Sequence, residues 1–348
     1  MPADAPASRL ALYLAGAYTL LAVYGSLYPF TGWTDSGAPL AAFLTAGWPR
    51  YTTAFDIALN VAAYAPMGFL WVAALRPKVG NWPAPIIAVV IGSLLSLSLE
   101  ALQNFLPSRV PSNLDFGGNA IGTLIGAVAG IFWGATLVDG GRLHSLRERL
   151  FVPGSMADKG LLLILFWLLT QVNPETLLFG NGDLRELLEL DALAYEVDDF
   201  ARIEAMIVGA NTLAVALLIS LLARTRLPVL VVLGAGLVAK SFAFVLIMNG
   251  HDGLAWATGG SLAGLVAGLG LWLPASLLPS RWRQALATVA LLFAAIVVNL
   301  APENPYLENT FQVWNPGQFL NFHGLTRLTS NLWPFLALPW LILLRGEK

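Results

Sequence analysis

Long apolar runs constrain this sequence more than any other feature. About ten stretches of roughly 20 residues are almost entirely apolar, and this is the length of helix that spans a bilayer. They are continuous rather than alternating, which favours helices over a closed β-barrel. The runs lie near residues 9–30, 53–75, 84–106, 115–137, 159–175, 203–223, 228–249, 254–274, 284–301 and 325–344. The sequence therefore predicts an all-α polytopic membrane protein with about ten transmembrane helices.

The composition supports this class and excludes others. Of the 348 residues, 57% are hydrophobic and 11% are charged, whereas a soluble domain has about 25% charged residues. Such a composition excludes a soluble enzyme and a disordered chain. The net charge of −2 lacks the basic excess of a nucleic-acid-binding protein. Because cysteine is absent, disulfides, zinc–thiolate sites, iron–sulfur clusters and thiol catalysis are excluded as well.

Basic residues are distributed unequally between the two sets of helix ends. Of the 19 Lys and Arg residues, 13 lie at one set of ends, five lie at the other, and Lys240 lies inside a run. Most of the 21 acidic residues lie on the Arg-poor side. Because basic loops remain in the cytoplasm, this asymmetry predicts that both termini are cytoplasmic.

The chain divides into units that resemble each other. Residues 1–138 and 159–275 each contain four predicted helices, and the basic cytoplasmic loop 139–158 joins them. The residues that match between the units are Gly118 with Gly260, Gly122 with Gly264, Gly126 with Gly268, and Asn60 with Asn211. Four helices per unit predict two parallel repeats, although glycine-rich helices also resemble one another by chance. The second unit carries an acidic outer loop, 175–204, and residues 276–348 are predicted to form a C-terminal helical hairpin with an aromatic outer loop.

Polar side chains inside the first unit form the main candidate site. Asp56, Asn60 and Tyr64 share one helix face because they are four residues apart. The predicted orientation places seven residues at one level, at or just below the outer surface: Asp56, Asn60, Glu100, Gln103, Arg109, Asp115 and Asn119. Polar residues are costly in lipid and indicate functional sites. Helix capping is the alternative interpretation, which explains Asp115 alone but fits Glu100, inside its helix, poorly.

These polar residues form a motif with fixed spacing. It reads Asp56-x3-Asn60-x3-Tyr64, then Glu100-x2-Gln103, Arg109, and Asp115-x3-Asn119. Over about residues 50–130 the motif resembles the VanZ family, which is named for low-level resistance to the lipoglycopeptide teicoplanin. The resemblance implies a membrane protein of the bacterial envelope, and we expect a multi-pass protein of the inner (cytoplasmic) membrane. It implies no mechanism.

The second unit lacks most of the charged motif but contains a lysine in mid-helix. Lys240 occupies the region equivalent to Glu100 and needs a partner or a wet cavity in the bilayer. Our hypothesis is that the second unit packs against the first and brings Lys240 to Glu100. Glu204 is the alternative partner, and a lysine that extends along the helix to the interface is a third interpretation.

Two classes of function fit these residues. The first is an outward-facing pocket that binds or handles an amphiphile, either a lipid-linked cell-envelope intermediate or a lipoglycopeptide such as teicoplanin. Its expected ligand-binding residues are Asn60, Tyr64, Gln103, Arg109, Asn119 and Lys240.

The second class is a membrane-embedded hydrolase or transferase that acts on a lipid-linked phosphate or sugar. Its catalytic residues would be Glu100, Asp56 and Asp115, with Glu100 as general acid. The Arg109 guanidinium would use two of its nitrogen atoms to bind a phosphate or a carboxylate. Asp56 and Asp115 could hold Mg²⁺ or Ca²⁺, and no other cofactor is expected. A scaffold whose polar cluster only locks helices together is the third interpretation.

Overall fold

The computed structural model describes residues 9–35, 37–48, 53–138, 141–185, 187–188, 197–247, 252–302, 304 and 320–344. Of the residues that the structure describes, 76% are helical, and they form no strand beyond an isolated bridge between Phe151 and Ala223. The predicted all-α class is therefore confirmed. Much of the acidic loop, residues 189–196, and of the aromatic loop, residues 305–319, lies outside the described residues.

Each predicted apolar run coincides with a helix. These helices are α1 (Leu10–Leu27), α3 (Ala54–Val79), α4 (Pro83–Gln103), α5 (Asn113–Val138), α7 (Ser155–Thr170), α8 (Val197–Leu222), α9 (Leu227–Ile247), α10 (Gly259–Ala275), α11 (Ser280–Leu300) and α13 (Leu320–Leu343). Two short helices accompany them, α2 (Ala42–Thr45) and α6 (Arg142–Leu150). Within the described residues, seven helices are long and apolar enough to cross a membrane: α1, α3, α4, α5, α8, α9 and α11. Ten spans remain a prediction, because α7 and α10 have only 16 and 17 residues and α13 is not among the helices that are apolar enough.

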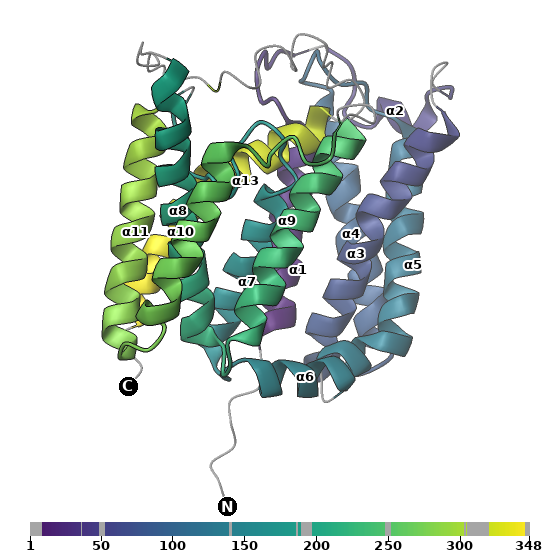
Figure 1. Cartoon of the computed structure of the whole chain (residues 1–348). Helices are drawn as coiled ribbons and strands as arrows, with labels where there is room; N and C mark the ends of the chain where they lie inside the picture. Colours follow the sequence, from purple (N-terminus) through teal and green to yellow (C-terminus); the bar gives the residue numbers. More distant parts are fainter. Residues whose placement is uncertain are drawn as a thin grey trace, which may run out of the picture. The chain divides into compact units, whose positions relative to one another are not determined.

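The helices belong to two compact units, which Figure 1 shows in their sequence colours. Unit 1 is Met1–Arg149, and unit 2 is Leu150–Lys348. The division falls inside the predicted basic loop 139–158, where α6 carries Arg142, Arg147 and Arg149. The two C-terminal helices pack within unit 2, where α11 contacts α8 and α13 contacts α7.

In unit 1, α5 packs on α3 through glycines, and the two helices run side by side in Figure 1. A Cβ atom at Gly122 would overlap the Val61 carbonyl, and one at Gly126 would overlap the Ala65 carbonyl. Glycine therefore allows the two backbones to touch, as small residues do between membrane helices. α4 packs against both of these helices and α1 packs against α3, so α3 is the centre of the unit.

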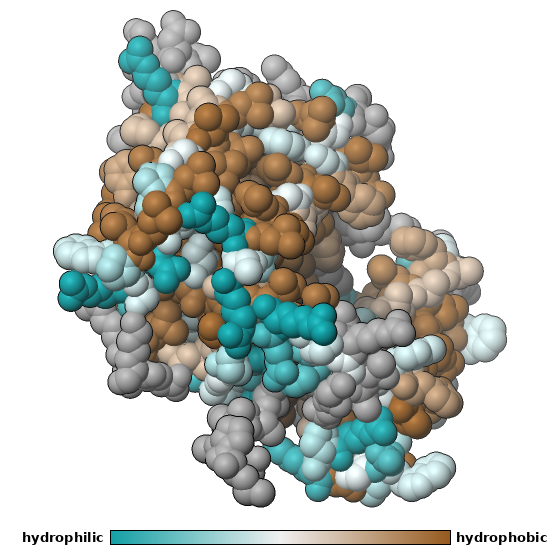
Figure 2. Space-filling view, turned by 60° about the horizontal axis from the view of Figure 1, so that its bottom comes forward, coloured by the Kyte–Doolittle hydropathy of each residue, from teal (hydrophilic) through white to brown (hydrophobic). Residues whose placement is uncertain are grey.

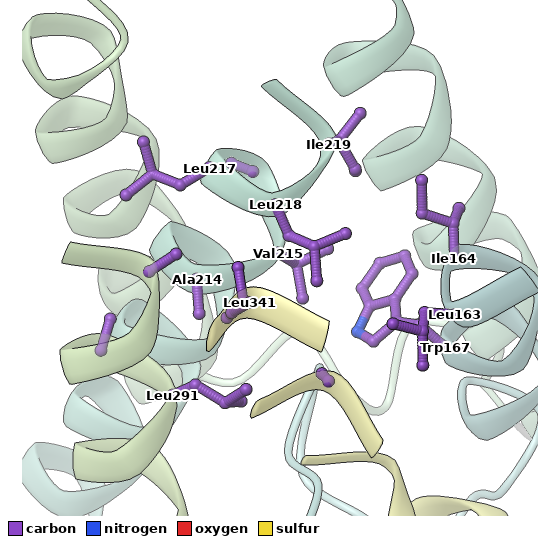
Figure 3. Close-up of a cluster of buried hydrophobic side chains, with 14 of the residues drawn as sticks. Leu163, Ile164, Trp167, Ala214, Val215, Leu217, Leu218, Ile219, Leu291 and Leu341 are labelled. Atoms are coloured by element: carbon purple, nitrogen blue, oxygen red, sulfur yellow. The ribbon is translucent and has the colours of Figure 1, made fainter. Parts of the chain in front are cut away.

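In unit 2, α8 is the central helix, and α10 and α11 pack against it. Figure 3 shows the apolar core, in which Leu217 and Leu218 of α8 lie among side chains of α7, α11 and α13. Trp167 of α7 is fully buried there. The indole Nε1 of Trp333 donates to the Leu163 carbonyl at 2.8 Å, which fixes α13 to α7. Burial of these large side chains from four helices stabilises the unit.

The outward surfaces of the helices are apolar. Leu94 of α4 is 57% exposed and Val266 of α10 is 70% exposed. Figure 2 shows apolar side chains over most of the visible helix surface, with hydrophilic side chains in separate groups. Apolar surface of this extent is suited to lipid rather than to water.

Candidate functional site

The polar residues of unit 1 meet at the end where α3 and α5 begin and α4 ends. α3 begins with a capping box, in which the Asp56 carboxylate accepts from the Thr53 backbone N–H at 2.8 Å and the Thr53 hydroxyl accepts from the Asp56 N–H. α5 begins after Ser112, whose hydroxyl oxygen accepts from the Leu114 N–H at 3.1 Å. These two caps fix where each helix starts and hence which side chains face α4.

Glu100 is the centre of the site. Its side chain is on the last turn of α4 and is 3% exposed. One carboxylate oxygen, Oε2, accepts from the Ser112 backbone N–H at 2.9 Å. The Asp115 carboxylate and the Tyr64 phenol both lie near enough to Glu100 to interact with it electrostatically. Two carboxylates from different helices therefore share one small region.

Amide side chains complete the arrangement. The Asn60 Nδ2 of α3 donates to Asp115 Oδ1 of α5 at 2.8 Å. The Asn119 Nδ2 donates to the Ser96 hydroxyl at 3.0 Å, and Asn119 Oδ1 is buried without a hydrogen-bond partner. We call these residues the Glu100 cluster, which comprises Asn60, Tyr64, Ser96, Glu100, Ser112, Asp115 and Asn119.

Three predicted site residues are engaged elsewhere. Asp56 forms the cap of α3, as described above. Gln103 donates through Nε2 to the Ser26 carbonyl at 3.1 Å and to the Ser26 hydroxyl at 3.0 Å, which ties α4 to α1. Arg109 donates through Nε and Nη2 to the Tyr28 carbonyl, and partial burial lowers the pKa of its guanidinium. The guanidinium therefore fastens the loop before α5 to the end of α1.

Ser96 and Ser112 are parts of the cluster that the sequence prediction did not assign to the site. Both carried a signal in the sequence. Ser96 is four residues before Glu100 and so shares its helix face, and Ser112 precedes Asp115 by three residues, which is typical of a helix N-cap.

Lys240 forms its contacts inside unit 2. Its ammonium donates to the Asn173 carbonyl at 2.7 Å, to the Thr176 hydroxyl at 3.0 Å and to the Thr176 carbonyl. The predicted alternative partner, Glu204, instead accepts from hydroxyl groups of residues 258 and 261. Three acceptors match the three donors of an ammonium, so the burial of Lys240 is explained without Glu100 or Glu204.

The residues fit the predicted divalent cation poorly. The Asp56 carboxylate is bound to Thr53, whereas Asp115 is bound to Asn60. In the part of the chain that the structure describes, no group of three or more His, Asp or Glu side chains could hold a metal ion. Oxygen-ligand cations need several such groups, so we derive no step through a metal.

These features define the class of protein first: a chain of apolar helices with a buried polar cluster is a multi-pass membrane protein. Residues 11–134 match the family model described as VanZ/LLP1, so unit 1 contains a VanZ-like segment and the predicted resemblance is confirmed. The match runs from α1 to residue 134 within α5 and includes every member of the Glu100 cluster. No curated protein and no solved structure matches the chain.

Proposed function

We propose that the Glu100 cluster binds the polar headgroup of an amphiphile whose tail lies in the bilayer. The observation that carries this proposal is the pair of carboxylates, Glu100 and Asp115, whose hydrogen bonds within the described residues come from uncharged groups. A carboxylate taken out of water is costly unless a donor-rich or cationic partner compensates it. A ligand that supplies such donors completes the site.

The chemistry of the cluster defines the headgroup. Carboxylate and amide oxygens accept hydrogen bonds, so they suit the amine or hydroxyl groups of a ligand. A lipid-linked cell-envelope intermediate and a lipoglycopeptide such as teicoplanin both join such groups to a long apolar tail. With basic loops in the cytoplasm of a bacterial inner membrane, the cluster lies on the side of the outer leaflet, where either amphiphile can reach it. The cluster therefore suits a headgroup that donates hydrogen bonds, rather than the phosphate that we first expected Arg109 to bind.

A second function is favoured by one observation, the proximity of Glu100 to Asp115. Paired carboxylates in different surroundings can divide the roles of acid and base. Glu100 is buried beside Leu99, whereas Asp115 is half-buried in the first turn of α5. A hydrolase or transferase that acts on a lipid-linked sugar would use Glu100 to protonate the leaving oxygen and Asp115 to activate water.

Binding of teicoplanin to the full-length chain in phospholipid nanodiscs tests the proposal. We expect Glu100→Gln and Asp115→Asn to weaken binding roughly tenfold or more, because each removes a charged acceptor. Asp56→Asn is the matched control: it removes a carboxylate from the first turn of α3, and the asparagine Oδ1 can still accept from the Thr53 N–H. Deacylated teicoplanin core should bind more weakly than teicoplanin to every folded variant.

Native mass spectrometry of the purified chain adds the second arm. Lipids retained by wild type and by Asp56→Asn, but lost from Glu100→Gln, would identify the natural amphiphile. Equal retention of teicoplanin and of lipids by wild type and Glu100→Gln would contradict the proposal. Turnover of a bound glycolipid by wild type alone would replace binding with the hydrolase or transferase. The scaffold interpretation predicts that Glu100→Gln does not fold.

A further inference from the structure

Unit 2 contains a cavity of about 400 Å³, and none of its lining residues belongs to the Glu100 cluster. Its walls come from the segment between α7 and α8, the first turn of α8, the end of α11 and the middle of α13. A volume of this size is typical of small-molecule sites, which range over roughly 300–1,000 Å³. The cavity has both polar and apolar walls.

The segment that forms the polar wall is held from three sides. Lys240 of α9 binds the carbonyls of Asn173 and Thr176, as described above. The Gly182 N–H donates to the Ser330 carbonyl of α13 at 2.9 Å. The Leu184 N–H donates to Asn299 Oδ1 of α11 at 2.8 Å. A wall fixed in this way is pre-organised, so binding a ligand requires little ordering of the protein.

The charged groups of the wall balance and engage one another. The lining contains two carboxylates, Glu175 and Asp183, and two guanidinium groups, Arg185 and Arg327. Arg185 binds both oxygens of Asp183, with Nε at 3.0 Å from Oδ1. Glu175 Oε2 lies 3.3 Å from His323 Nε2, and Arg327 and Lys240 act on it electrostatically. An anion or a cation would have to disrupt these pairs, so the wall selects against charged ligands.

Amide groups give the cavity its free hydrogen-bonding capacity. Asn173 is 1% exposed and lines the cavity. Its Oδ1 accepts from the Glu175 N–H at 2.9 Å, whereas its Nδ2 is buried without a partner. An unpaired buried donor is costly, and an acceptor oxygen on a ligand would satisfy it. The amide of Asn331 also lines the cavity and supplies both a donor and an acceptor.

We infer that this cavity is a second binding site, for the uncharged, polyhydroxylated headgroup of a glycosylated amphiphile. Sugar hydroxyls both donate and accept, which matches the amide groups of the polar wall. The apolar part of the lining, which includes Leu177, Phe200 and Val298, offers a surface for the C–H face of a sugar ring. The site lies wholly in unit 2, so it does not depend on the ligand of the Glu100 cluster.

Three photoreactive probes with the same diazirine-bearing octyl tail test this inference. Their headgroups are β-D-glucosyl, phosphate and trimethylammonium, and each is added to the full-length chain in phospholipid nanodiscs. We expect the glucosyl probe to label the peptides that contain residues 173–185 and 298–304 several-fold more than the charged probes do. Excess octyl β-D-glucoside should remove this labelling. Equal labelling by all three probes would overturn the proposal, because it would reflect contact with lipid alone.

Two matched variants locate the headgroup. Asn331→Phe fills the cavity and should abolish preferential labelling by the glucosyl probe. Leu332→Phe alters the neighbouring, 40% exposed residue of α13 and should leave it unchanged. Asn173→Asp keeps the acceptor for Glu175 but removes the unpaired donor, and it should weaken labelling roughly two- to tenfold. Unchanged labelling in a folded Asn331→Phe or Asn173→Asp chain would contradict the inference, whatever the outcome for teicoplanin at unit 1.

Discussion

Each unit contains one pair of helices whose backbones touch through glycine, α3 with α5 in unit 1 and α8 with α10 in unit 2. The positions of contact follow the same order. In unit 1, a Cβ atom at Gly122 would meet Val61 and one at Gly126 would meet Ala65. In unit 2, a Cβ atom at Gly264 would meet Ala205 and one at Gly268 would meet Gly209. α3 and α8 both have 26 residues, and α4 and α9 both have 21. The two units therefore share a way of packing helices.

The polar side chains beside these glycines differ. Gly118 faces Asn60, whereas the matching Gly260 faces Glu204. Asn60 binds Asp115, while Glu204 Oε1 accepts from the hydroxyls of Thr258 at 2.6 Å and Ser261 at 2.8 Å. The packing thus places Glu204 where Asn60 lies, and the sequence match of Asn60 with Asn211 is not supported. The Asn211 Nδ2 instead donates to the Ile207 carbonyl of its own helix.

This difference shows that packing and site chemistry are separable. Glycines fix the distance between two helices, and the neighbouring positions are then able to carry an amide, a carboxylate or a hydroxyl. Whether the two units descend from one duplicated unit remains a prediction. Changes to the glycines should act on stability in both units, whereas changes to the polar residues should act differently in each.

The largest effect is expected from enlarging the contact glycines. Gly126→Leu places a side chain where the Ala65 carbonyl lies and should lower the free energy of unfolding by about 3 kcal/mol or more. Gly268→Leu should act in the same direction in unit 2, where a Cβ atom would lie 2.6 Å from the Gly209 carbonyl. Thermal unfolding followed by tryptophan fluorescence measures both.

Control glycines exist on the same two helices. A Cβ atom at Gly117 of α5 or at Gly270 of α10 would meet no atom within 4 Å, so leucine there should be tolerated. If Gly126→Leu were as stable as Gly117→Leu, the contact between the α3 and α5 backbones would be wrong.

A smaller loss is expected from Lys240 of unit 2. Lys240→Met keeps the apolar stem but removes the ammonium donor from the Thr176 carbonyl, and it leaves the Asn173 carbonyl with the Thr176 hydroxyl as donor. We expect a loss of about 2 kcal/mol in the free energy of unfolding. Lys240→Gln, which keeps a donor on a shorter chain, should recover part of it. A snorkelling lysine would instead tolerate methionine at no cost.

The helices were predictable because apolar runs of membrane length carry a strong local signal. α4 begins at Pro83 and α1 begins at Leu10, each within one residue of its predicted start. The meeting of Asn60, Glu100 and Asp115 could also be predicted, since helix direction places them at one level. Such signals depend only on spacing along a helix.

The partners of long side chains could not be predicted in the same way. Arg109 and Lys240 both bind backbone carbonyls, at Tyr28 and at residues 173–176. Every residue carries a carbonyl, so the sequence contains no mark of which one accepts. The direction of a loop relative to its neighbours decides these contacts, and that direction depends on tertiary packing. The cavity of unit 2 was missed for the same reason.

Replacing an amide by a carboxylate in unit 1, and a carboxylate by an amide in unit 2, tests whether packing and site chemistry are separable. Asn60→Asp would set a carboxylate against Asp115, whose Oδ1 lies 2.8 Å from the Asn60 amide nitrogen. We expect a loss of about 1 kcal/mol or more, because a hydrogen bond becomes a repulsion. Glu204→Gln should cost less, since Oε1 still accepts from Thr258 and Ser261. Chemical denaturation measures the free energy of unfolding of both variants. A larger loss in Glu204→Gln than in Asn60→Asp would contradict the prediction.

The smallest effect is a pH dependence of stability. It concerns Glu175 of unit 2, which lies in the segment between two helices rather than inside a helix. Burial raises the pKa of Glu175 above its usual value, and the opposing effects of Arg327 and Lys240 do not cancel this rise. A carboxyl group whose pKa is raised in the folded state stabilises that state most below its unfolded pKa. The stabilisation is then lost as the pH rises through the folded pKa. Glu175→Gln should remove this dependence.

Melting temperatures of wild type and Glu175→Gln, measured from about pH 4 to pH 8, check the sign. Relative to the variant, wild type should lose stability as the pH rises, because the buried carboxyl must then ionise. If wild type instead gained stability over Glu175→Gln with rising pH, the contact with His323 and the fields of Arg327 and Lys240 would outweigh burial.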